Sequence, residues 1–190
     1  MTRLTGGSLH HGGATARGDR GAAGTAGQAV RHVPRGGYPT RVTVTRDVAA
    51  SRQQVWDVMA DGWTYSQWVV GNSRMRAVDP NWPAPGSTIR HSIGVWPAVI
   101  NDETVAETCV PLEELVLLAK TGPFGAARVT LRLSDIPDGC RVEMDEVAVR
   151  PPMKWVPHAV QAVALWPRNR ETLWRLGALA ERLKPSELSS

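Results

Sequence analysis

The stretch PRNRETLWRLGALAERL, residues 167–183, sets the architecture expected for the whole chain. Its apolar residues recur at steps of three and four, which places them on one face of an α-helix; they are Leu173, Leu176, Ala180 and Leu183. Pro167 fits near the start of this helix, because its missing N–H is not needed there, and Pro185 follows its end. Residues 153–165 predict a further helical segment that begins near Pro157, and a kink at Pro167 is expected between the two. An amphipathic helix of this length requires an apolar surface to pack against.

That surface is expected from the preceding residues, which alternate polar and apolar side chains with the period of two that is typical of β-strands. Strands are predicted at residues 40–49, 73–78, 88–95, 99–110, 114–120, 126–133 and 140–149. The last six follow one another through short connections rich in Gly, Pro, Asn and Asp, with no helix between them. The sequence therefore predicts an antiparallel meander in an α+β domain.

Two short helices are predicted after the first strand. Ser51 is a favourable N-cap for the first, and Gln54 at the third helical position completes a capping box. The pair Asp61-Gly62 marks the end of this helix. The second helix is expected over residues 64–70.

Length and composition predict one domain over residues 38–185, which is long enough for a sizeable core. Residues 1–37 contain 10 of the 18 glycines and show no apolar periodicity, so they are predicted to form a disordered tail, with a second short tail at 186–190. No run of 18 apolar residues is present, so no integral membrane segment is expected, and without an apolar signal segment the predicted location is cytoplasmic.

Charge and motifs exclude several classes of function. Residues 1–37 hold five arginines and one acid, and since the chain has 22 basic and 18 acidic residues, the remainder has 17 of each. This balance predicts no nucleic-acid partner. Cys109 and Cys140 lie in strand-like stretches and are interpreted as reduced small hydrophobic residues. Metal-ligand spacings and a phosphate-binding glycine loop are missing from the sequence, so no metal and no cofactor are predicted, and the sequence does not indicate an oligomeric state.

Alternation assigns side-chain faces in three of the strands. In each, the residues on the more apolar face are expected to point toward the helix. They are Ala127, Val129, Leu131 and Leu133, then Val142, Met144, Glu146 and Ala148, and finally Ile89, His91, Ile93 and Val95. The faces of the strand at 99–110 stay undecided, because neither set of alternate residues is uniformly apolar.

His91 and Glu146 are titratable groups on otherwise apolar faces, where an unpaired polar group costs free energy. In a structural interpretation, His91 is a hydrogen-bonded core histidine, and Glu146 bonds a backbone amide or an arginine. In a functional interpretation, both line a pocket and His91 acts as a general acid or base.

Eight tryptophans supply nearly all of the aromatic volume, because only one Phe and two Tyr accompany them. Core packing is the simpler interpretation for each and is preferred for Trp56 and Trp174. The other six lie near loops around the expected gap between sheet and helix, where several together would line an apolar pocket with N–H donors; they are Trp63, Trp68, Trp82, Trp96, Trp155 and Trp166.

Three segments carry a resemblance to a known superfamily: VTVTRDVAASRQQVWDVMADGWTYSQWV at 42–69, ARVTLRLSDIPDGCRVEMDE at 127–146 and RNRETLWRLGALAERL at 168–183. Over residues of about 40–184 the chain resembles the START-like (SRPBCC) superfamily of polyketide cyclases/dehydrases and lipid-transfer domains. The resemblance implies a helix-grip fold, in which a curved seven-stranded antiparallel sheet wraps a long C-terminal helix and two short helices follow the first strand. It also implies a deep, largely apolar cavity between sheet and helix. Members of the superfamily bind or carry ligands, some cyclise polyketides, and no universal catalytic motif exists.

Three functions follow as hypotheses. The first is binding or carriage of a hydrophobic or aromatic small molecule in the cavity between sheet and helix. The second is a polyketide aromatase/cyclase-type enzyme, in which His91 moves a proton and Glu146 orients it. The third is a protein-interaction module anchored by an exposed Trp82 or Trp96. The predicted pocket comprises Trp63, Trp68, Ile89, His91, Ile93, Trp96, Val129, Leu131, Met144, Glu146, Trp155, Leu173 and Gly177. Gly177 is included because a helical glycine costs about 1 kcal/mol against alanine, which room for a ligand or close approach of a strand would explain.

Overall fold

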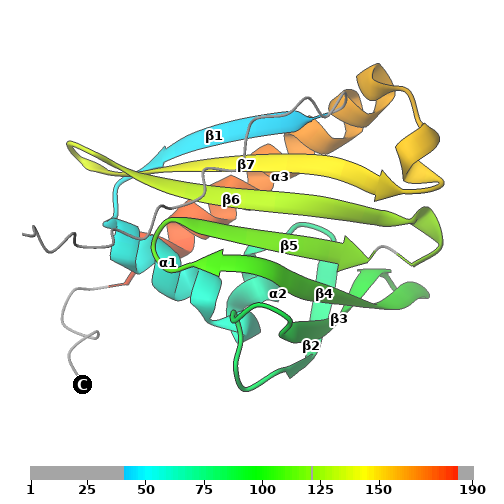
Figure 1. The fold of residues 1–190 in the computed structure, drawn as a ribbon, viewed down its shortest axis with the longest axis horizontal. Coiled ribbons are helices and arrows are strands. Elements are labelled where there is room, and N and C mark those ends of the chain that lie inside the picture. Colours follow the sequence, from blue (N-terminus) through cyan, green and yellow to red (C-terminus); the bar gives the residue numbers. More distant parts are fainter. Residues whose placement is uncertain (1–40, 121, 184–190) are drawn as a thin grey trace, which may run out of the picture. The chain divides into compact units, whose positions relative to one another are not determined.

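The computed structural model describes residues 41–120 and 122–183 (Figure 1). The predicted tails, residues 1–37 and 186–190, lie outside the described residues. The order of elements is a strand, two short helices, six strands and a long helix, as the sequence predicts.

One seven-stranded antiparallel sheet forms the body of the domain, in the order β1-β7-β6-β5-β4-β3-β2 (Figure 1). Strands β2 to β7 form the predicted meander, and β1 closes the other edge by pairing with β7, where Val44 lies opposite Met144. The strands are β1 Val42–Val48, β2 Asn72–Val78, β3 Thr88–Val95, β4 Ala98–Val110, β5 Glu114–Lys120, β6 Ala126–Ile136 and β7 Gly139–Arg150.

The predicted capping box starts α1, Arg52–Ala60. The Ser51 hydroxyl accepts from the Gln54 amide at 3.2 Å, and the Gln54 side-chain oxygen accepts from the Ser51 amide at 2.9 Å. The second helix is shorter than predicted, because a 3-10 turn, η1 Gly62–Thr64, precedes α2 Tyr65–Trp68. Two more 3-10 turns, η2 Gly122–Phe124 and η3 Met153–Trp155, connect the later elements.

The C-terminal helix differs from the prediction. A single helix, α3 His158–Ala180, runs through Pro167, so the division into two helical segments is wrong, whereas the kink expected at this residue stays a prediction. Proline removes the hydrogen bond to the carbonyl four residues earlier. That carbonyl belongs to Val163, whose side chain is 78% exposed, and Pro167 is itself exposed, so water can replace the lost donor.

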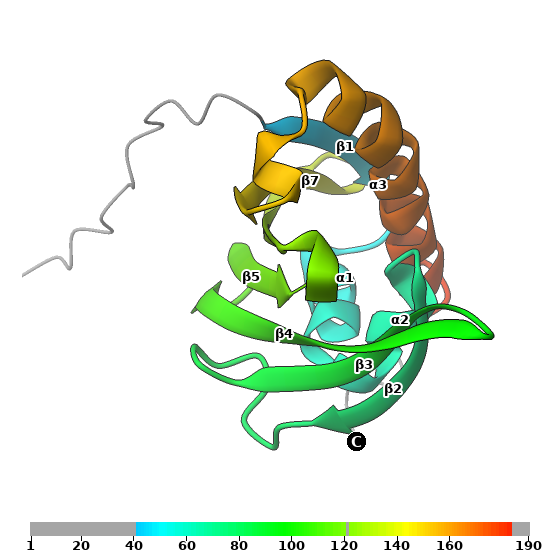
Figure 2. The same ribbon diagram turned by 90° about the vertical axis from the view of Figure 1, so that its right-hand side faces the viewer.

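Helix α3 packs against β1 and β7 at one edge of the sheet and against α1 and α2 (Figure 2). Apart from Val95, whose side chain is outside the described part of the structure, the residues predicted to point inward are buried or partly buried. Leu131 and Val142 are fully buried beside Leu173 and Leu176 of α3, and Ile93 is partly buried.

The inward face of β4, which the sequence left undecided, is now assigned. Asp102, Thr104 and Ala106 are its buried residues. The sequence shows no clean period of two because two of these inward residues are polar, and a register shift between Ala106 and Thr108 interrupts the alternation further along the strand.

Candidate functional site

His91 stands on the inward face of β3 with 3% of its surface exposed. Its Nε2 atom lies 3.0 Å from the Thr104 hydroxyl on β4. Its Nδ1 atom is buried and has no hydrogen-bond partner among the described residues. Burial, and secondarily the positive charge of Arg76, lower the pKa of His91 from 6.5 to about 4. The imidazole is therefore neutral at pH 7, with one ring nitrogen bonded and the other available.

Tyr65 of α2 meets the same threonine from the helical side. Its hydroxyl is 3.3 Å from the Thr104 hydroxyl, and its ring centroid lies 5.4 Å from that of His91. Burial raises the pKa of Tyr65, so the phenol keeps its proton. Trp68, one turn later, contacts the Tyr65 ring edge-on at 5.1 Å, and its buried indole N–H has no partner in the described part of the chain. Tyr65, His91 and Thr104 thus form a neutral polar group in an apolar interior.

Glu146 lies on the inward face of β7 and is 4% exposed. Arg168 of α3 donates from one Nη1 atom to both carboxylate oxygens, at 3.1 and 3.0 Å. The same arginine donates from Nε to the Val70 carbonyl at 3.2 Å, and the Thr172 hydroxyl accepts from the Val70 amide at 3.2 Å. This pair fixes α3 to the loop after α2 and agrees with the structural interpretation of Glu146.

Within residues 41–120 and 122–183, hydrogen bonds join His91 to Thr104 and Glu146 to Arg168, and none joins His91 to Glu146. Strands β4, β5 and β6 separate β3 from β7 in the sheet. The charges of Glu146 and Arg168 nevertheless act on the pKa of Tyr65, in opposite directions, so the two polar groups lie within electrostatic reach of one another. The use of Glu146 to orient His91 stays a prediction.

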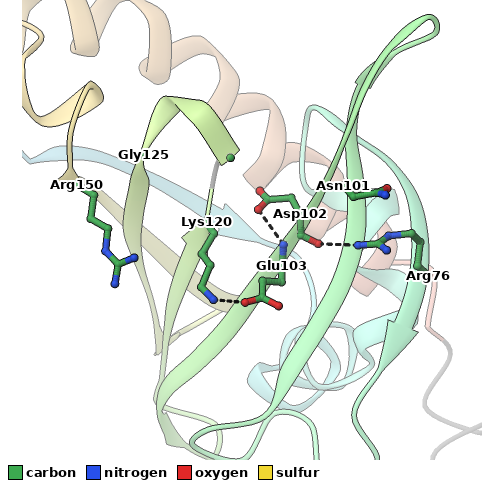
Figure 3. Close-up of a pocket in the computed structure, with 8 residues that line it drawn as sticks. Arg76, Asn101, Asp102, Glu103, Lys120, Gly125 and Arg150 are labelled. Carbon is green, nitrogen blue, oxygen red and sulfur yellow. Dashed lines mark hydrogen bonds and ion pairs between the residues drawn. The ribbon is translucent and has the colours of Figure 1, made fainter.

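A polar pocket of about 360 Å³ opens beside this interior (Figure 3). Asp102 belongs to its lining and is two residues from Thr104 on the buried face of β4. Arg76 donates to the backbone carbonyls of His91 and Asp102, both at 3.3 Å, and Lys120 pairs with Glu103. Burial raises the pKa of Asp102. The lining residues are Arg76, Asn101, Asp102, Glu103, Lys120, Gly122, Gly125 and Arg150.

Eleven of the thirteen residues predicted to line a ligand pocket fall into two groups, and Ile93 is partly buried. Eight are buried in the interior: Trp68, Ile89, His91, Val129, Leu131, Met144, Glu146 and Leu173. Three lie at the surface, where Trp63 is 57%, Trp96 85% and Trp155 76% exposed, and their part in a pocket stays a prediction. Gly177 lies against β1, because a Cβ atom there would come within 3.0 Å of Arg46 and 3.1 Å of Val48. Close approach of a strand therefore accounts for this glycine.

Sequence reasoning missed Thr104 and Tyr65. Thr104 lies on the strand whose faces could not be assigned, and Tyr65 was one aromatic residue among several in the short second helix. The expectation that Trp174 packs in the core is wrong, since it is 57% exposed, whereas Trp56 is buried as expected. Trp82 is also buried and donates from Nε1 to the Met59 carbonyl at 3.4 Å, so it is not an exposed anchor.

Two further observations bear on the type of site. Within residues 41–120 and 122–183, no group of three or more His, Cys, Asp or Glu side chains is arranged to hold a metal ion. None of the helices in this part of the chain is long and apolar enough to span a bilayer.

Comparison with known proteins adds the family. A family model described as polyketide cyclase / dehydrase and lipid transport matches residues 39–181. The chain belongs to this family. No curated protein matches the sequence.

Solved structures share the fold of this family member. A protein from Rhodobacter sphaeroides superposes with a TM-score of 0.63 at 20% identity, over 78% of this chain and 97% of that one. The Zhui aromatase/cyclase from Streptomyces sp. R1128 has a TM-score of 0.59 at 16% identity, over 75% and 93% of the two chains. The di-domain aromatase/cyclase StfQ of the steffimycin biosynthetic pathway has a TM-score of 0.58 at 11% identity, over 75% of this chain and 51% of its own.

Proposed function

We propose that this protein binds a hydrophobic or aromatic small molecule that carries a polar group, on the inward face of the sheet next to Tyr65, His91 and Thr104. The observation that carries the proposal is the His91 Nδ1 atom, which is buried without a partner in the described residues although buried polar atoms are almost always hydrogen-bonded. A ligand hydroxyl or carbonyl would supply that partner. An apolar lining with a few oriented polar groups is the usual composition of a small-molecule site.

The neutral state of the three polar side chains favours a neutral ligand group. His91 and Tyr65 are uncharged at pH 7, because burial shifts their pKa values away from neutrality in the directions given above. A charged ligand group at the same position would lose its hydration without gaining an ion pair from these residues. We therefore expect phenols and ketones to bind more tightly than carboxylates of the same size.

Binding is tested with 2-naphthol, an aromatic probe with one hydroxyl, by following tryptophan fluorescence. Saturable binding is expected, and Thr104→Val or His91→Phe should weaken it about five- to tenfold, the effect of one hydrogen bond. Thr45→Val, a matched substitution on the exposed face of β1, should leave binding unchanged. The proposal fails if 2-naphthol does not saturate and native mass spectrometry of gently purified protein detects no bound compound.

A second candidate function is ring closure of the aromatase/cyclase type, the type to which the similar proteins Zhui and StfQ belong. The neutral His91 imidazole favours it, since it can accept a proton from a carbon next to a carbonyl. The resulting enolate carbon would form a bond to a second carbonyl of the same chain, and the new alkoxide would take a proton from Tyr65 or from water.

An enzyme of this type removes a proton from its substrate, whereas a binding protein does not, so a measurement of proton transfer distinguishes the two functions. Exchange of the methylene hydrogens of a β-keto ester with deuterium can be followed by NMR. An enzyme should accelerate the exchange, and His91→Gln should remove the acceleration while 2-naphthol binding changes only a few-fold. Equal exchange rates with and without protein would leave binding as the function.

A further inference from the structure

The outward side of α3 is apolar over most of its length, whereas the outward side of a helix in a soluble domain is normally polar. Val163 is 78%, Val160 57%, Trp174 57% and Trp166 47% exposed. Together with Pro167 and Arg170 they recur at the spacing of one helix face. We call this set the α3 outer stripe; its residues are Val160, Val163, Trp166, Pro167, Arg170 and Trp174.

The stripe is hollowed, and a further exposed tryptophan lies near the start of the helix. A groove of about 530 Å³ runs along it past Trp166 and Trp174. The turn η3 lies at the same end of the domain as the first turns of α3 in both views (Figures 1 and 2), and its Trp155 is 76% exposed. Exposed apolar surface of this extent marks an interaction site.

The charge around the first half of the stripe is positive, while Glu171, which also lines the groove, is paired with Arg175 at 2.8 Å. Residues 147–170 contain no acid and four basic residues, although the whole of residues 38–190 is balanced. Glu146 engages Arg168, which leaves Arg150, Lys154 and Arg170 at the surface. Arg170 lies over the Trp166 ring at 5.5 Å, and Arg46 lies over the Trp174 ring at 6.0 Å. Cations on long stems beside aromatic rings suit a boundary between apolar and anionic surroundings.

We propose that the α3 outer stripe and η3 dock on the surface of an anionic lipid bilayer, with α3 parallel to the membrane plane. Val160 and Val163 would enter the boundary of the acyl chains, the tryptophans would lie at the level of the head groups, and Lys154 and Arg170 would meet lipid phosphates. This inference is independent of the ligand proposed above. It describes surface attachment without a spanning segment.

The positive charge beside the α3 outer stripe favours a bilayer over two other occupants, a second copy of the protein and the segment 1–37 of the same chain. A second copy packed on the same face would bring Arg150, Lys154 and Arg170 of both copies together, because a two-fold interface sets equivalent surfaces against each other. The segment 1–37 of this chain carries a net charge of +4 and would also be repelled. An anionic membrane offers the opposite charge and an apolar layer at once.

Sedimentation of the full chain with vesicles tests the proposal. Vesicles of three parts phosphatidylcholine to one part phosphatidylglycerol should bind the protein, with a blue shift of tryptophan emission, and pure phosphatidylcholine vesicles should bind it much less. Trp166→Ser with Trp174→Ser should lower the partition coefficient roughly tenfold or more, and Arg170→Glu should lower it several-fold. Trp63→Ser is the matched control, since Trp63 is as exposed as Trp174 but lies on η1.

Five results would overturn the proposal. The first is no binding to the anionic vesicles, and the second is an equal loss with Trp63→Ser. The third is retained binding by the double tryptophan variant with unchanged circular dichroism. The fourth is a stable dimer in analytical ultracentrifugation that Trp174→Ser converts to a monomer, which would assign the stripe to a second copy. Binding to soluble poly-glutamate as tight as to vesicles would likewise assign it to an acidic protein.

Discussion

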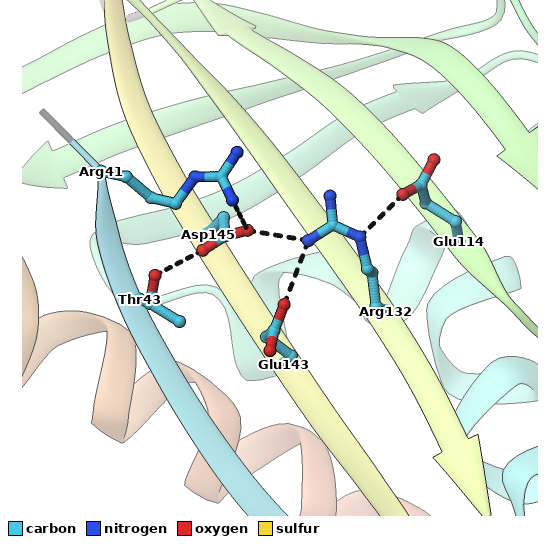
Figure 4. Close-up of polar contacts among 6 residues, drawn as sticks. All are labelled: Arg41, Thr43, Glu114, Arg132, Glu143 and Asp145. Atoms are coloured by element: carbon cyan, nitrogen blue, oxygen red, sulfur yellow. Dashed lines mark hydrogen bonds and ion pairs between the residues drawn. The ribbon is translucent and has the colours of Figure 1, made fainter. Parts of the chain in front are cut away.

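Asp145 and Glu146 are neighbours on β7 and point to opposite faces of the sheet, and both acids are almost fully buried, at 2% and 4% exposed. On the outer face, Asp145 is bonded by Arg132 at 2.7 Å, by Arg41 at 3.1 Å and by the Thr43 hydroxyl (Figure 4). On the inner face, Arg168 is the single ion-pair partner of Glu146 among the described residues.

The difference lies in how many partners share each charge. Arg132 also bonds Glu114 at 2.9 Å and Glu143 at 3.1 Å, so the outer acids and arginines form a network that can redistribute its contacts (Figure 4). Among the described residues, Glu146 has no second arginine that could replace Arg168. A buried charge that loses its only partner costs much more free energy than a pair at the surface contributes. The two faces are therefore expected to respond very differently to the loss of one arginine.

Arg168→Met should have the largest effect, because it leaves the Glu146 carboxylate buried and unpaired. The free energy of unfolding, measured in urea, should fall by about 3 kcal/mol or more. Arg170→Met, two residues later on the exposed side of α3, is the matched control and should change it by less than about 0.5 kcal/mol. Equal stability of the two variants would show that Arg168 does not compensate Glu146.

Protonation of His91 at acid pH should lower the free energy of unfolding by less than Arg168→Met does and by more than Arg41→Ala does. Its pKa of about 4 in the folded protein is below the unfolded value of 6.5, so protonation favours unfolding. The contribution is fully present above pH 6.5 and is lost as the pH falls toward 4, which amounts to about 2 to 3 kcal/mol.

Urea unfolding at several pH values, compared with His91→Gln, isolates this contribution. The comparison is needed because the pKa of Asp102 is raised in the folded protein, so protonation of Asp102 at acid pH stabilises the fold, whereas protonation of His91 destabilises it. A wild-type protein and a His91→Gln variant with parallel pH profiles would contradict a lowered histidine pKa.

Arg41→Ala should have the smallest effect. Its side chain is 36% exposed, and Asp145 keeps Arg132 and Thr43 when it is removed. Thermal unfolding should show a loss of no more than about 0.5 kcal/mol. A loss as large as that of Arg168→Met would mean that the outer network does not redistribute.

The sequence predicts those features of the fold that depend on neighbouring residues, such as the buried face of a strand and the start of a helix. The alternation in residues 127–133 assigns the buried face of β6, and the Ser51–Gln54 capping box locates the start of α1. His91 and Glu146 are identified because a polar residue on an apolar face of a strand stands out in the alternation.

Features that depend on tertiary contacts could not be predicted. Arg168 becomes the partner of Glu146 only when α3 lies along β7, and nothing near Glu146 in the sequence indicates this arginine. Thr104 is hidden because the inward face of β4 carries polar residues, Asp102 and Thr104, so it does not stand out as the apolar face. The outward stripe of α3 was missed because α3 continues through Pro167, whereas the sequence alone favours an interruption there.

The pairing of β1 with β7 has a consequence for how the protein is made. The hydrogen bond between Thr43 and Asp145 spans 102 residues, so the first strand of the domain has no neighbour while the ribosome synthesises the meander. Non-local pairing of this kind slows folding, since the chain entropy is lost before the contact forms. Val42, Val44 and Val48, which β7 and α3 later bury, stay exposed through that interval. The nascent chain is therefore a substrate for chaperones until its last strand has emerged.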